Sequence, residues 1–364
     1  MFGGVIEGFL MKNMKILHIN TEKTYRGGER QTIILIKALK EKGIDSTLLC
    51  RENYPLSKIA ERDGINIIRA KGVFESISAL ILNSSRHDII HSHAGKAQGI
   101  AAIARLFVKT PHVYTRRVVF KHRKKYPTIL KYNFTDKVVC VSKAVKEVLL
   151  SYGIADRKLA VIYDAVPKKS NLKRKRAEEL LKSLNIPADK KIVGNIGALT
   201  REKNHKTILL AAREVKDAYF LIFGDGKLRD KLQQLIRHLN LQDRVFLVGF
   251  KDNVEDFFLI FDIFVMSSLS EGLSNVVLDA FLYKVPVITT AVGGLKELVF
   301  DNYSGMLVPV NDYNSMAEKI IFLLKNRDIA QRLSSNAYRL VEEKFNLERM
   351  TSEYIDVYMS LLRK

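Results

Sequence analysis

Residues 262–284, DIFVMSSLSEGLSNVVLDAFLYK, contain the strand–loop–helix unit that decides the fold. The first seven residues form an apolar run typical of a buried strand, and the last ten have the apolar spacing of a helix that ends before Pro286. The loop between them contains Gly272, and Ser274 is a good N-cap for the helix. A buried strand that leads through a loop into a helix predicts an α/β protein with a parallel sheet.

The same alternation of short apolar runs and helical patterns extends along the chain and is interrupted once. It predicts one α/β domain over residues 14–167 and a second over residues 191–345, separated by a basic linker and helix at 168–190. Residues 346–364 have the pattern of one more amphipathic helix. Residues 1–13 fit a disordered extension or an upstream start codon better than a signal peptide, because they lack a basic n-region.

The composition is that of a globular protein, with 47% hydrophobic residues among 364 and a mean hydropathy of −0.04. The two cysteines, Cys50 and Cys140, each lie in an apolar run, which predicts buried thiols in a reducing cytoplasm and no disulfide or metal framework. We therefore expect a cytoplasmic protein that is peripheral on the inner face of the membrane, for the reasons of charge that follow.

Charge is distributed unevenly between the two halves of the chain. The formal net charge is +21; residues 1–176 contain 35 Lys and Arg against 14 Asp and Glu, whereas the remaining 188 residues contain 25 of each. The asymmetry predicts a partner with negative charge that meets the first half only. Nucleic acid, an anionic membrane face and an anionic small acceptor all satisfy this condition.

The loop and helix of residues 268–281 also suggest a ligand. A helix N-terminus presents free N–H groups and a positive partial charge, so the start near Ser274 would attract phosphate. Glu271 stands just before this point and Asp279 more than a turn beyond it. A nucleotide sugar has a sugar on one side of its diphosphate and a ribose on the other. Each carboxylate could accept hydrogen bonds from a pair of hydroxyl groups, one from the sugar and the other from the ribose. The alternative is a solvated loop glutamate and a surface-facing helical aspartate.

A diphosphate also needs cations or a metal. The sequence contains no D-x-D pair, which disfavours a metal-bridged diphosphate. Arg201 and Lys203 follow the first strand of the second domain, where they could neutralise a leaving group. The alternative is a pair of solvated loop charges.

Five motifs, in this order along the chain, resemble the family 4 retaining glycosyltransferases: RGGERQ, HDIIHSHAG, VVCVSKAVKEVLLSYG, GALTREKNHKTILLAA and SEGLSNVVLDA. The last looks like the E-x7-E motif of that family, and the resemblance extends from Met14 to the C-terminus. It implies a GT-B fold, with two Rossmann-like domains that face a central cleft and a C-terminal helix that crosses back onto the first. The first domain would bind mainly the acceptor and the second mainly the nucleotide-sugar donor.

The resemblance also implies roles for residues of the second domain. Glu271 would hold the hydroxyls of the donor sugar, Asp279 would hold the ribose, and Lys203 matches the diphosphate lysine of the family. Gly272 and Leu273 would offer backbone N–H groups near the phosphates and the sugar. Three positions depart from the family pattern: Asp279 replaces the second glutamate, Ala198 stands where many relatives have an arginine, and Asn204 stands where glycine is common.

In the first domain, Gly27 and Gly28 would let a loop approach the donor closely, since glycine lacks a Cβ that would clash. His93 matches the active-site histidine near the transferred sugar, and its alternative is a structural histidine at a strand end. The family transfers sugars with retention by a route in which the leaving diphosphate assists the acceptor. We therefore expect a metal-independent enzyme with no cofactor, whose co-substrate is a nucleotide diphosphate sugar.

Residues 115–132 combine basic and aromatic side chains, which predicts a surface for an anionic membrane or a phosphorylated glycolipid acceptor. The alternative is a solvated basic face. The basic residues are Arg116, Arg117, Lys121, Arg123, Lys124 and Lys125.

The function predicted from these observations is transfer of a hexose-type sugar to a glycan or lipid-linked acceptor, in the synthesis of lipopolysaccharide or another cell-surface glycan. A sugar-nucleotide epimerase of the same fold is the first rival. A nucleic-acid-binding protein is less well supported, because it would not explain the neutral second half with its loop and helix acids. A dinucleotide dehydrogenase is weaker still, since no glycine-rich segment has G-x-G-x-x-G spacing.

Overall fold

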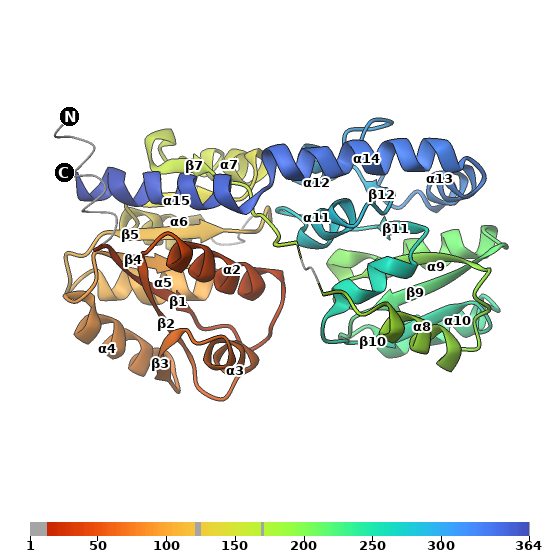
Figure 1. The fold of residues 1–364 in the computed structure, drawn as a ribbon. Coiled ribbons are helices and arrows are strands. Elements are labelled where there is room, and N and C mark those ends of the chain that lie inside the picture. Colours follow the sequence, from red (N-terminus) through yellow and green to blue (C-terminus); the bar gives the residue numbers. More distant parts are fainter. Residues whose placement is uncertain (1–12, 121–124, 169–170, 364) are drawn as a thin grey trace. The chain divides into compact units, whose positions relative to one another are not determined.

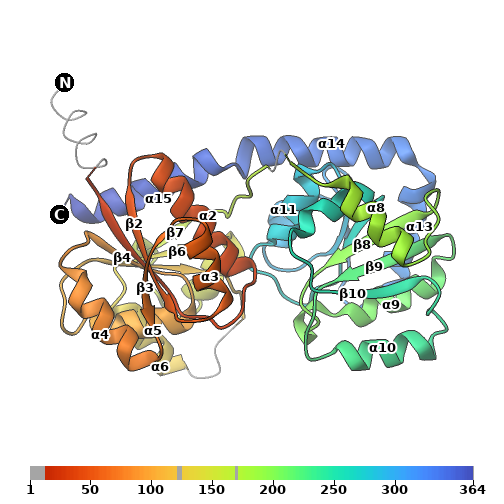
Figure 2. The same cartoon turned by 60° about the horizontal axis from the view of Figure 1, so that its bottom comes forward.

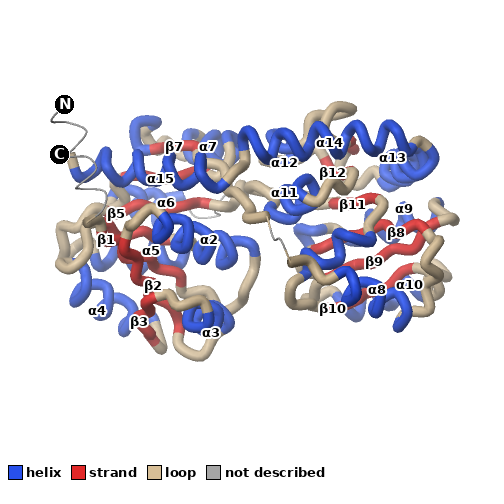
Figure 3. The backbone as a smooth tube through the Cα atoms, in the orientation of Figure 1, coloured by secondary structure: helices blue, strands red, loops and turns tan. Residues whose placement is uncertain are grey.

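The computed structural model describes residues 13–120, 125–168 and 171–363. The chain divides into two compact units (Figure 1). Unit 1 comprises Met1–Pro167 together with Asn346–Lys364, and unit 2 comprises Lys168–Phe345. In each unit strands alternate with helices along the chain, as Figure 3 shows.

Unit 1 is built on a seven-stranded parallel sheet with the order β3-β2-β1-β4-β5-β6-β7. Its inner strands are buried on both faces, as expected for a sheet that helices cover on both sides, whereas the edge strands are only partly buried. The strands are β1 (Lys15–Asn20), β2 (Asp45–Arg51), β3 (Asn66–Ala70), β4 (Ile89–Ser92), β5 (His112–Arg116), β6 (Lys137–Cys140) and β7 (Leu159–Val161).

Helices cover both faces of the sheet of unit 1. One face is covered by α2 (Gly27–Glu41), α3 (Pro55–Arg62) and the C-terminal α15 (Leu347–Leu362), which share two apolar clusters with the strands. The opposite face is covered by α4 (Val73–Ser84) and α5 (Gly95–Ala104), with α6 (Lys125–Asn133) beside α5 (Figure 2). The crossover from β6 to β7 contains α7 (Lys143–Leu150).

Unit 2 repeats this plan with a six-stranded parallel sheet in the order β10-β9-β8-β11-β12-β13. The strands are β8 (Lys191–Ile196), β9 (Ala218–Phe223), β10 (Val245–Gly249), β11 (Ile263–Met266), β12 (Val287–Thr290) and β13 (Met306–Val308). The helices are α8 (Arg174–Ser183), α9 (His205–Glu214), α10 (Arg229–His238), α11 (Asn275–Leu282), α12 (Leu295–Leu298), α13 (Tyr313–Lys325) and α14 (Arg327–Lys344).

Strand order reverses once in each sheet, between β1 and β4 in unit 1 and between β8 and β11 in unit 2. Ligands of doubly wound sheets bind at this reversal, beyond the carboxyl ends of the strands. The residues that follow β4 and β11 therefore occupy the position at which each unit would hold a ligand. They include His93 in unit 1 and Glu271 in unit 2.

The C-terminal helix α15 packs on unit 1 through two tyrosines. Tyr354 and Tyr358 are completely buried, and their hydroxyl groups reach Thr115 and His91 of the sheet at 3.0 and 2.7 Å. The predicted α/β fold, with two Rossmann-like domains and a C-terminal helix on the first, is therefore confirmed. Among the described residues, no helix is both long enough and apolar enough to cross a membrane.

Candidate active site

Glu271 and Lys203 form an ion pair at the carboxyl edge of the sheet of unit 2. Lys203 Nζ contacts Glu271 Oε1, and the Ser268 hydroxyl donates to the same oxygen at 3.0 Å. Both charged side chains are partly buried. The sequence analysis predicted both residues but not their contact, because the two positions are 68 residues apart. Arg201, two residues before Lys203, has an exposed side chain.

The ion pair is held by contacts between the loops on which the two residues lie. The Ser267 hydroxyl lies 3.0 Å from the Lys203 carbonyl and 2.9 Å from the Asn204 carbonyl, and the Leu269 N–H donates to the Glu202 carbonyl at 2.8 Å. Asn204 has a left-handed backbone, with φ of 51°. Asparagine tolerates this conformation better than other residues with a side chain, which accounts for its presence where relatives commonly have glycine.

A glycine pair after β12 makes close contact with the Glu271 loop. The Gly294 N–H donates to the Glu271 carbonyl at 3.0 Å, and a Cβ added to Gly293 would lie 2.1 Å from that carbonyl oxygen. Gly293 also has a positive φ of 47°. The sequence analysis missed this contact, although two adjacent glycines one residue after the strand VPVITTA were a detectable signal.

Helix α11 begins at Asn275 with Ser274 at its N-cap position, as predicted. The expected side-chain cap is wrong: the Ser274 hydroxyl makes no cap hydrogen bond and lies 3.5 Å from the sulfur of Met266 instead. The side chain of Ser274 therefore does not occupy the N–H groups of the first turn. Gly272, Leu273 and Ser274 are themselves buried.

Asp279 is 0% exposed on α11. This burial excludes the surface-facing alternative. A carboxylate that is away from water needs polar partners. Its contact with a ribose stays a prediction.

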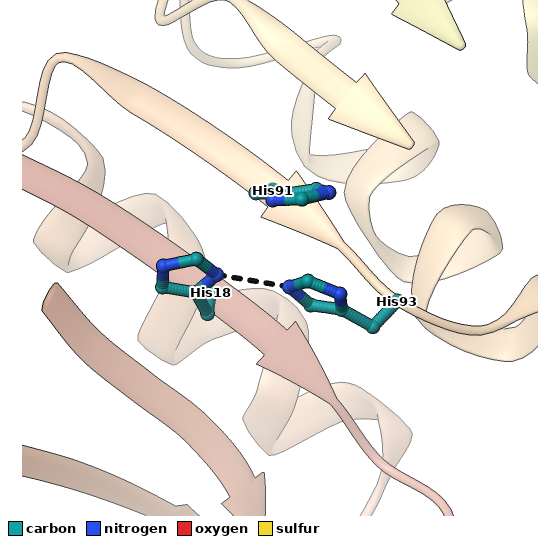
Figure 4. Close-up of side chains that lie close together, drawn as sticks. All are labelled: His18, His91 and His93. Carbon is teal, nitrogen blue, oxygen red and sulfur yellow. Dashed lines mark hydrogen bonds between the residues drawn. The ribbon is translucent and has the colours of Figure 1, made fainter. Parts of the chain in front are cut away.

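In unit 1, His93 belongs to a group of three buried histidines at neighbouring strands (Figure 4). His18 on β1 and His91 on β4 are register partners, and His93 follows β4. His93 Nε2 lies 2.9 Å from His18 Nδ1, so one ring donates and the other accepts according to the tautomer. The sequence analysis identified His93 but missed the other two. The repeated histidines at strand ends in ILHIN and IIHSHAG were the available signal.

Burial favours the neutral form of these imidazoles. Loss of hydration lowers the pKa of His18 to about 3 and lowers those of His91 and His93 well below the usual value. Neighbouring histidines and the positive charge of Arg117 lower the pKa values of His91 and His93 further. Within the described residues, His93 Nδ1 and His18 Nε2 are buried without a hydrogen-bond partner. His93 Nδ1 therefore has unused hydrogen-bonding capacity, although it is buried in this structure.

Among the described residues, this histidine group is also where side chains could share a metal ion, since its ligand atoms lie within 4.8 Å of one another. Two observations disfavour a cation. Both nitrogens of His91 have hydroxyl partners, Tyr358 at 2.7 Å and Thr115 at 2.8 Å. Arg117 places positive charge nearby, as its effect on the pKa of His91 and of His93 shows. The arrangement suits a hydrogen-bonded network of neutral rings better than a metal centre.

Gly27 and Gly28 are the first two residues of α2, and not part of a loop as the sequence analysis expected. The Arg26 N–H at this helix start donates to the Glu29 carboxylate at 2.8 Å. A Cβ added to Gly28 would lie 3.8 Å from the nearest atom, Cδ of Arg117, which is an ordinary van der Waals distance. Packing within unit 1 therefore does not require glycine at this position.

The predicted basic surface of residues 115–132 is wrong for its first two arginines. Arg116 is completely buried, and its guanidinium donates to the carbonyls of Val118 and Phe120 and to the Tyr132 hydroxyl. Arg117 pairs with the buried Asp164 at 3.2 Å. Internal acceptors compensate the burial of Arg116, whereas Asp164 is the acceptor for two of the three guanidinium nitrogens of Arg117. Lys121, Arg123 and Lys124, and the side chain of Lys125, lie outside the described residues.

Comparison with known proteins matches each half of the chain to a glycosyltransferase family model. The model described as Glycosyltransferase Family 4 matches residues 25–169, and the model described as Glycosyl transferases group 1 matches residues 176–340. The uncharacterized glycosyltransferase MJ1178 of Methanocaldococcus jannaschii is 30% identical over 366 residues, which cover 97% of this chain and 92% of the relative. The lipopolysaccharide core biosynthesis glycosyltransferase LpsE of Rhizobium meliloti is 25% identical over 355 residues, 95% and 99% of the two chains.

A solved structure agrees in fold. HepE of Anabaena in complex with UDP-glucose superposes with a TM-score of 0.86 at 19% identity, over 95% of this chain and 100% of that one. The two family models together with MJ1178 show that this chain belongs to the family 4 glycosyltransferases, with a group 1 glycosyltransferase domain in its second half.

Proposed function

We propose that this glycosyltransferase moves a hexose-type sugar from a nucleotide diphosphate sugar to a lipid-linked glycan, with retention of configuration and without a metal. The observation that carries the proposal is the Lys203–Glu271 ion pair, held next to the start of α11. It joins a cation suited to a diphosphate with a carboxylate suited to sugar hydroxyls. The complex of HepE with UDP-glucose supports the donor class by analogy.

Donor binding would exchange partners within this pair. A diphosphate carries more negative charge than one carboxylate, so it would displace Glu271 from Lys203 and rest against the N–H groups at the start of α11. Glu271 would then be free to accept hydrogen bonds from the sugar, while Ser268 keeps one of its oxygens in place. The buried Asp279 would meet the ribose only after its neighbours move.

In the transfer step, Lys203 would stabilise the charge that develops on the leaving diphosphate. That diphosphate would assist deprotonation of the acceptor on the same face of the sugar, which produces retention. His93 would offer Nδ1 to a substrate hydroxyl, with its ring orientation set by His18. Positioning and electrostatic stabilisation would account for catalysis without a covalent intermediate on the protein.

The acceptor is proposed to be an anionic glycan on a lipid carrier or on lipopolysaccharide. Residues 1–167 of unit 1 contain 29 Lys and Arg against 14 Asp and Glu, and this excess of positive charge supports an anionic partner for unit 1. The relative LpsE is named for lipopolysaccharide core biosynthesis, which supports a cell-surface glycan as the product.

A thermal-shift panel of nucleotide diphosphates and their sugars tests the donor class first, because a ligand that binds the native state raises its stability by mass action. We expect a shift with one nucleotide diphosphate and with its sugar conjugates. Incubation of the identified donor alone then distinguishes a transferase from an epimerase of the same fold. A transferase leaves the donor intact or hydrolyses it slowly, whereas conversion to its epimer would overturn the proposal.

A further inference from the structure

Helices α4 and α5 present an apolar surface to solvent on unit 1. Four of its side chains are largely exposed: Phe74 (87%), Leu82 (74%), Phe107 (70%) and Leu106 (62%). Val73 and Ile103 add smaller exposed areas. We refer to these six residues as the α4–α5 face.

The residues of this face lie side by side. Phe74, Ser78 and Leu82 recur every four positions and so line one side of α4, over about 12 Å. Leu106 and Phe107 form the turn directly after α5, and the Thr110 hydroxyl beyond that turn donates to the Ser84 carbonyl at the end of α4 at 3.1 Å. Both helices pack on the same face of the sheet, so their outward sides form one surface (Figure 2).

The solvent-facing side of α4 carries large apolar side chains, although polar side chains are found on its buried side. Its buried side includes Ser76 and Ser84, whose hydroxyls donate to backbone carbonyls of the helix or its N-cap at 2.6 and 2.8 Å. Its outward side has the largely exposed Phe74 and Leu82 beside the polar Ser78. A surface helix normally places its polar residues outward, so this pattern indicates a partner outside the chain and not a requirement of the core.

The charges around the α4–α5 face favour an anionic partner. Residues 71–109 contain five Lys and Arg against two acids. Lys71, Arg86, Lys96 and Lys109 are exposed, whereas the acids, Glu75 and Asp88, accept hydrogen bonds from the backbone N–H groups of Lys71 and Lys15, at 2.8 Å in both cases. A second copy of the chain would oppose basic groups to basic groups. An anionic lipid surface would match the charges and also take up the apolar side chains.

We infer that the α4–α5 face is the surface by which this glycosyltransferase docks on an anionic membrane. The aromatic and leucine side chains insert at the boundary between headgroups and acyl chains, and the surrounding lysines and arginines contact the headgroups. The buried Arg116 and the partly buried Arg117 are not part of the α4–α5 face. This face lies on helices that the sequence analysis did not consider as a docking surface.

Flotation of the full-length chain with lipid vesicles tests the inference, and it needs neither donor nor acceptor, so its outcome is independent of the proposed transfer reaction. We expect binding at low salt to vesicles of phosphatidylcholine with phosphatidylglycerol, and weaker binding to phosphatidylcholine alone. The variant Phe74→Ser/Phe107→Ser should bind about 100-fold more weakly, about tenfold for each aromatic group removed from the membrane.

The exposed phenylalanines of unit 2 provide a matched control. Phe250→Ser/Phe322→Ser removes the same side chains from the other unit and should leave vesicle binding unchanged. Lys96→Gln/Lys109→Gln should abolish the preference for phosphatidylglycerol while keeping the thermal stability of the wild type. Leu82→Ser/Leu106→Ser gives a second test of the apolar contact if the phenylalanine variant is unstable.

Three results would overturn the inference. The first is equal vesicle binding by Phe74→Ser/Phe107→Ser and wild type. The second is no binding of the wild type to anionic vesicles at low salt. The third is a concentration-dependent dimer in sedimentation velocity that Phe74→Ser/Phe107→Ser abolishes, since the face would then be an interface between copies.

Discussion

Lys203 is the residue on which the proposed chemistry depends most. Its ammonium group is paired with Glu271 and would pair with the diphosphate when the donor binds. One side chain would then both bind the donor and stabilise the leaving group. The same exchange would set Glu271 free for the sugar. This exchange of ion-pair partners could not be predicted from the sequence, because it depends on the contact between the Lys203 loop and the Glu271 loop.

Lys203→Ala should lower kcat by about 10²-fold or more, the usual cost of one electrostatic contact to the transition state. The loss in kcat should exceed the loss in donor affinity, because charge on the diphosphate grows as the sugar leaves. Steady-state kinetics with the identified donor measure both. Lys216→Ala, an exposed lysine just after α9, is the control that should keep wild-type values. A near-normal kcat for Lys203→Ala would contradict the role.

Gly293→Ala should displace the Glu271 loop, because Gly293 packs against the backbone of that loop. The new Cβ would collide with the Glu271 carbonyl, and the positive φ adds strain, so we expect a loss of about 3 kcal/mol in the free energy of unfolding and weaker donor binding. Gly64→Ala is the matched control: its φ is +66° but nothing lies within 4 Å of the added Cβ, so about 1 kcal/mol should be lost. Urea unfolding compares the two, and equal losses would refute the steric argument.

At the level of elements, the strand–loop–helix unit of residues 262–284 was predictable because its apolar periodicity changes where β11 ends and α11 begins. Contacts between elements were not predictable in this way. The His18–His91 pairing depends on β1 and β4 being neighbours in the sheet, and the burial of Arg117 depends on Asp164, 47 residues away. Polar residues that pair across the fold look like surface residues in the sequence.

The C-terminal helix α15 contacts His91 directly through the hydroxyl group of Tyr358, and indirectly through Tyr354 and Thr115. Tyr358→Phe removes the partner of His91 Nδ1 and leaves that nitrogen buried, which should cost about 1–3 kcal/mol of unfolding free energy. Tyr338→Phe on α14, whose hydroxyl contacts the exposed Lys168, should cost less than about 0.5 kcal/mol. Urea denaturation followed by circular dichroism measures both variants. If Tyr358→Phe were as stable as the control variant, the hydrogen bond between His91 and Tyr358 would not contribute to the stability of unit 1.

At the scale of the whole molecule, the fold and the family were within reach of the sequence, because five motifs in order and a repeated α/β pattern specify them together. The surface that we propose for membrane docking was not, because exposure is a property of the packed structure. Charge counting predicted an anionic partner for the first half of the chain, but the side chains that we propose meet it are on α4 and α5, away from the most basic segment.

Stability should depend on pH through the buried histidines. Burial lowers the pKa of His18 to about 3 and those of His112 and His205 to about 4, so between about pH 6.5 and these values the unfolded chain binds protons that the folded chain does not. Stability is therefore lost as pH falls from about 6.5 to about 4, by up to about 1.4 kcal/mol per pH unit for each group.

The variant His18→Asn should reduce this pH dependence, whereas His238→Gln, at an exposed position, should not. Urea unfolding of the wild type and both variants at several pH values provides the comparison. An unchanged pH slope in His18→Asn would show that His18 is not one of the groups responsible.

Isothermal titration of the matching nucleotide diphosphate and its sugar conjugate into three proteins tests the central claim most directly. For Lys203→Ala we predict weakened binding of both ligands, since the cation for the diphosphate is missing. For Glu271→Gln we predict that the nucleotide diphosphate binds at least as tightly as to the wild type, because its competitor for Lys203 is gone, while the extra affinity contributed by the sugar is lost. Wild-type affinity of Lys203→Ala for the nucleotide diphosphate would contradict the account.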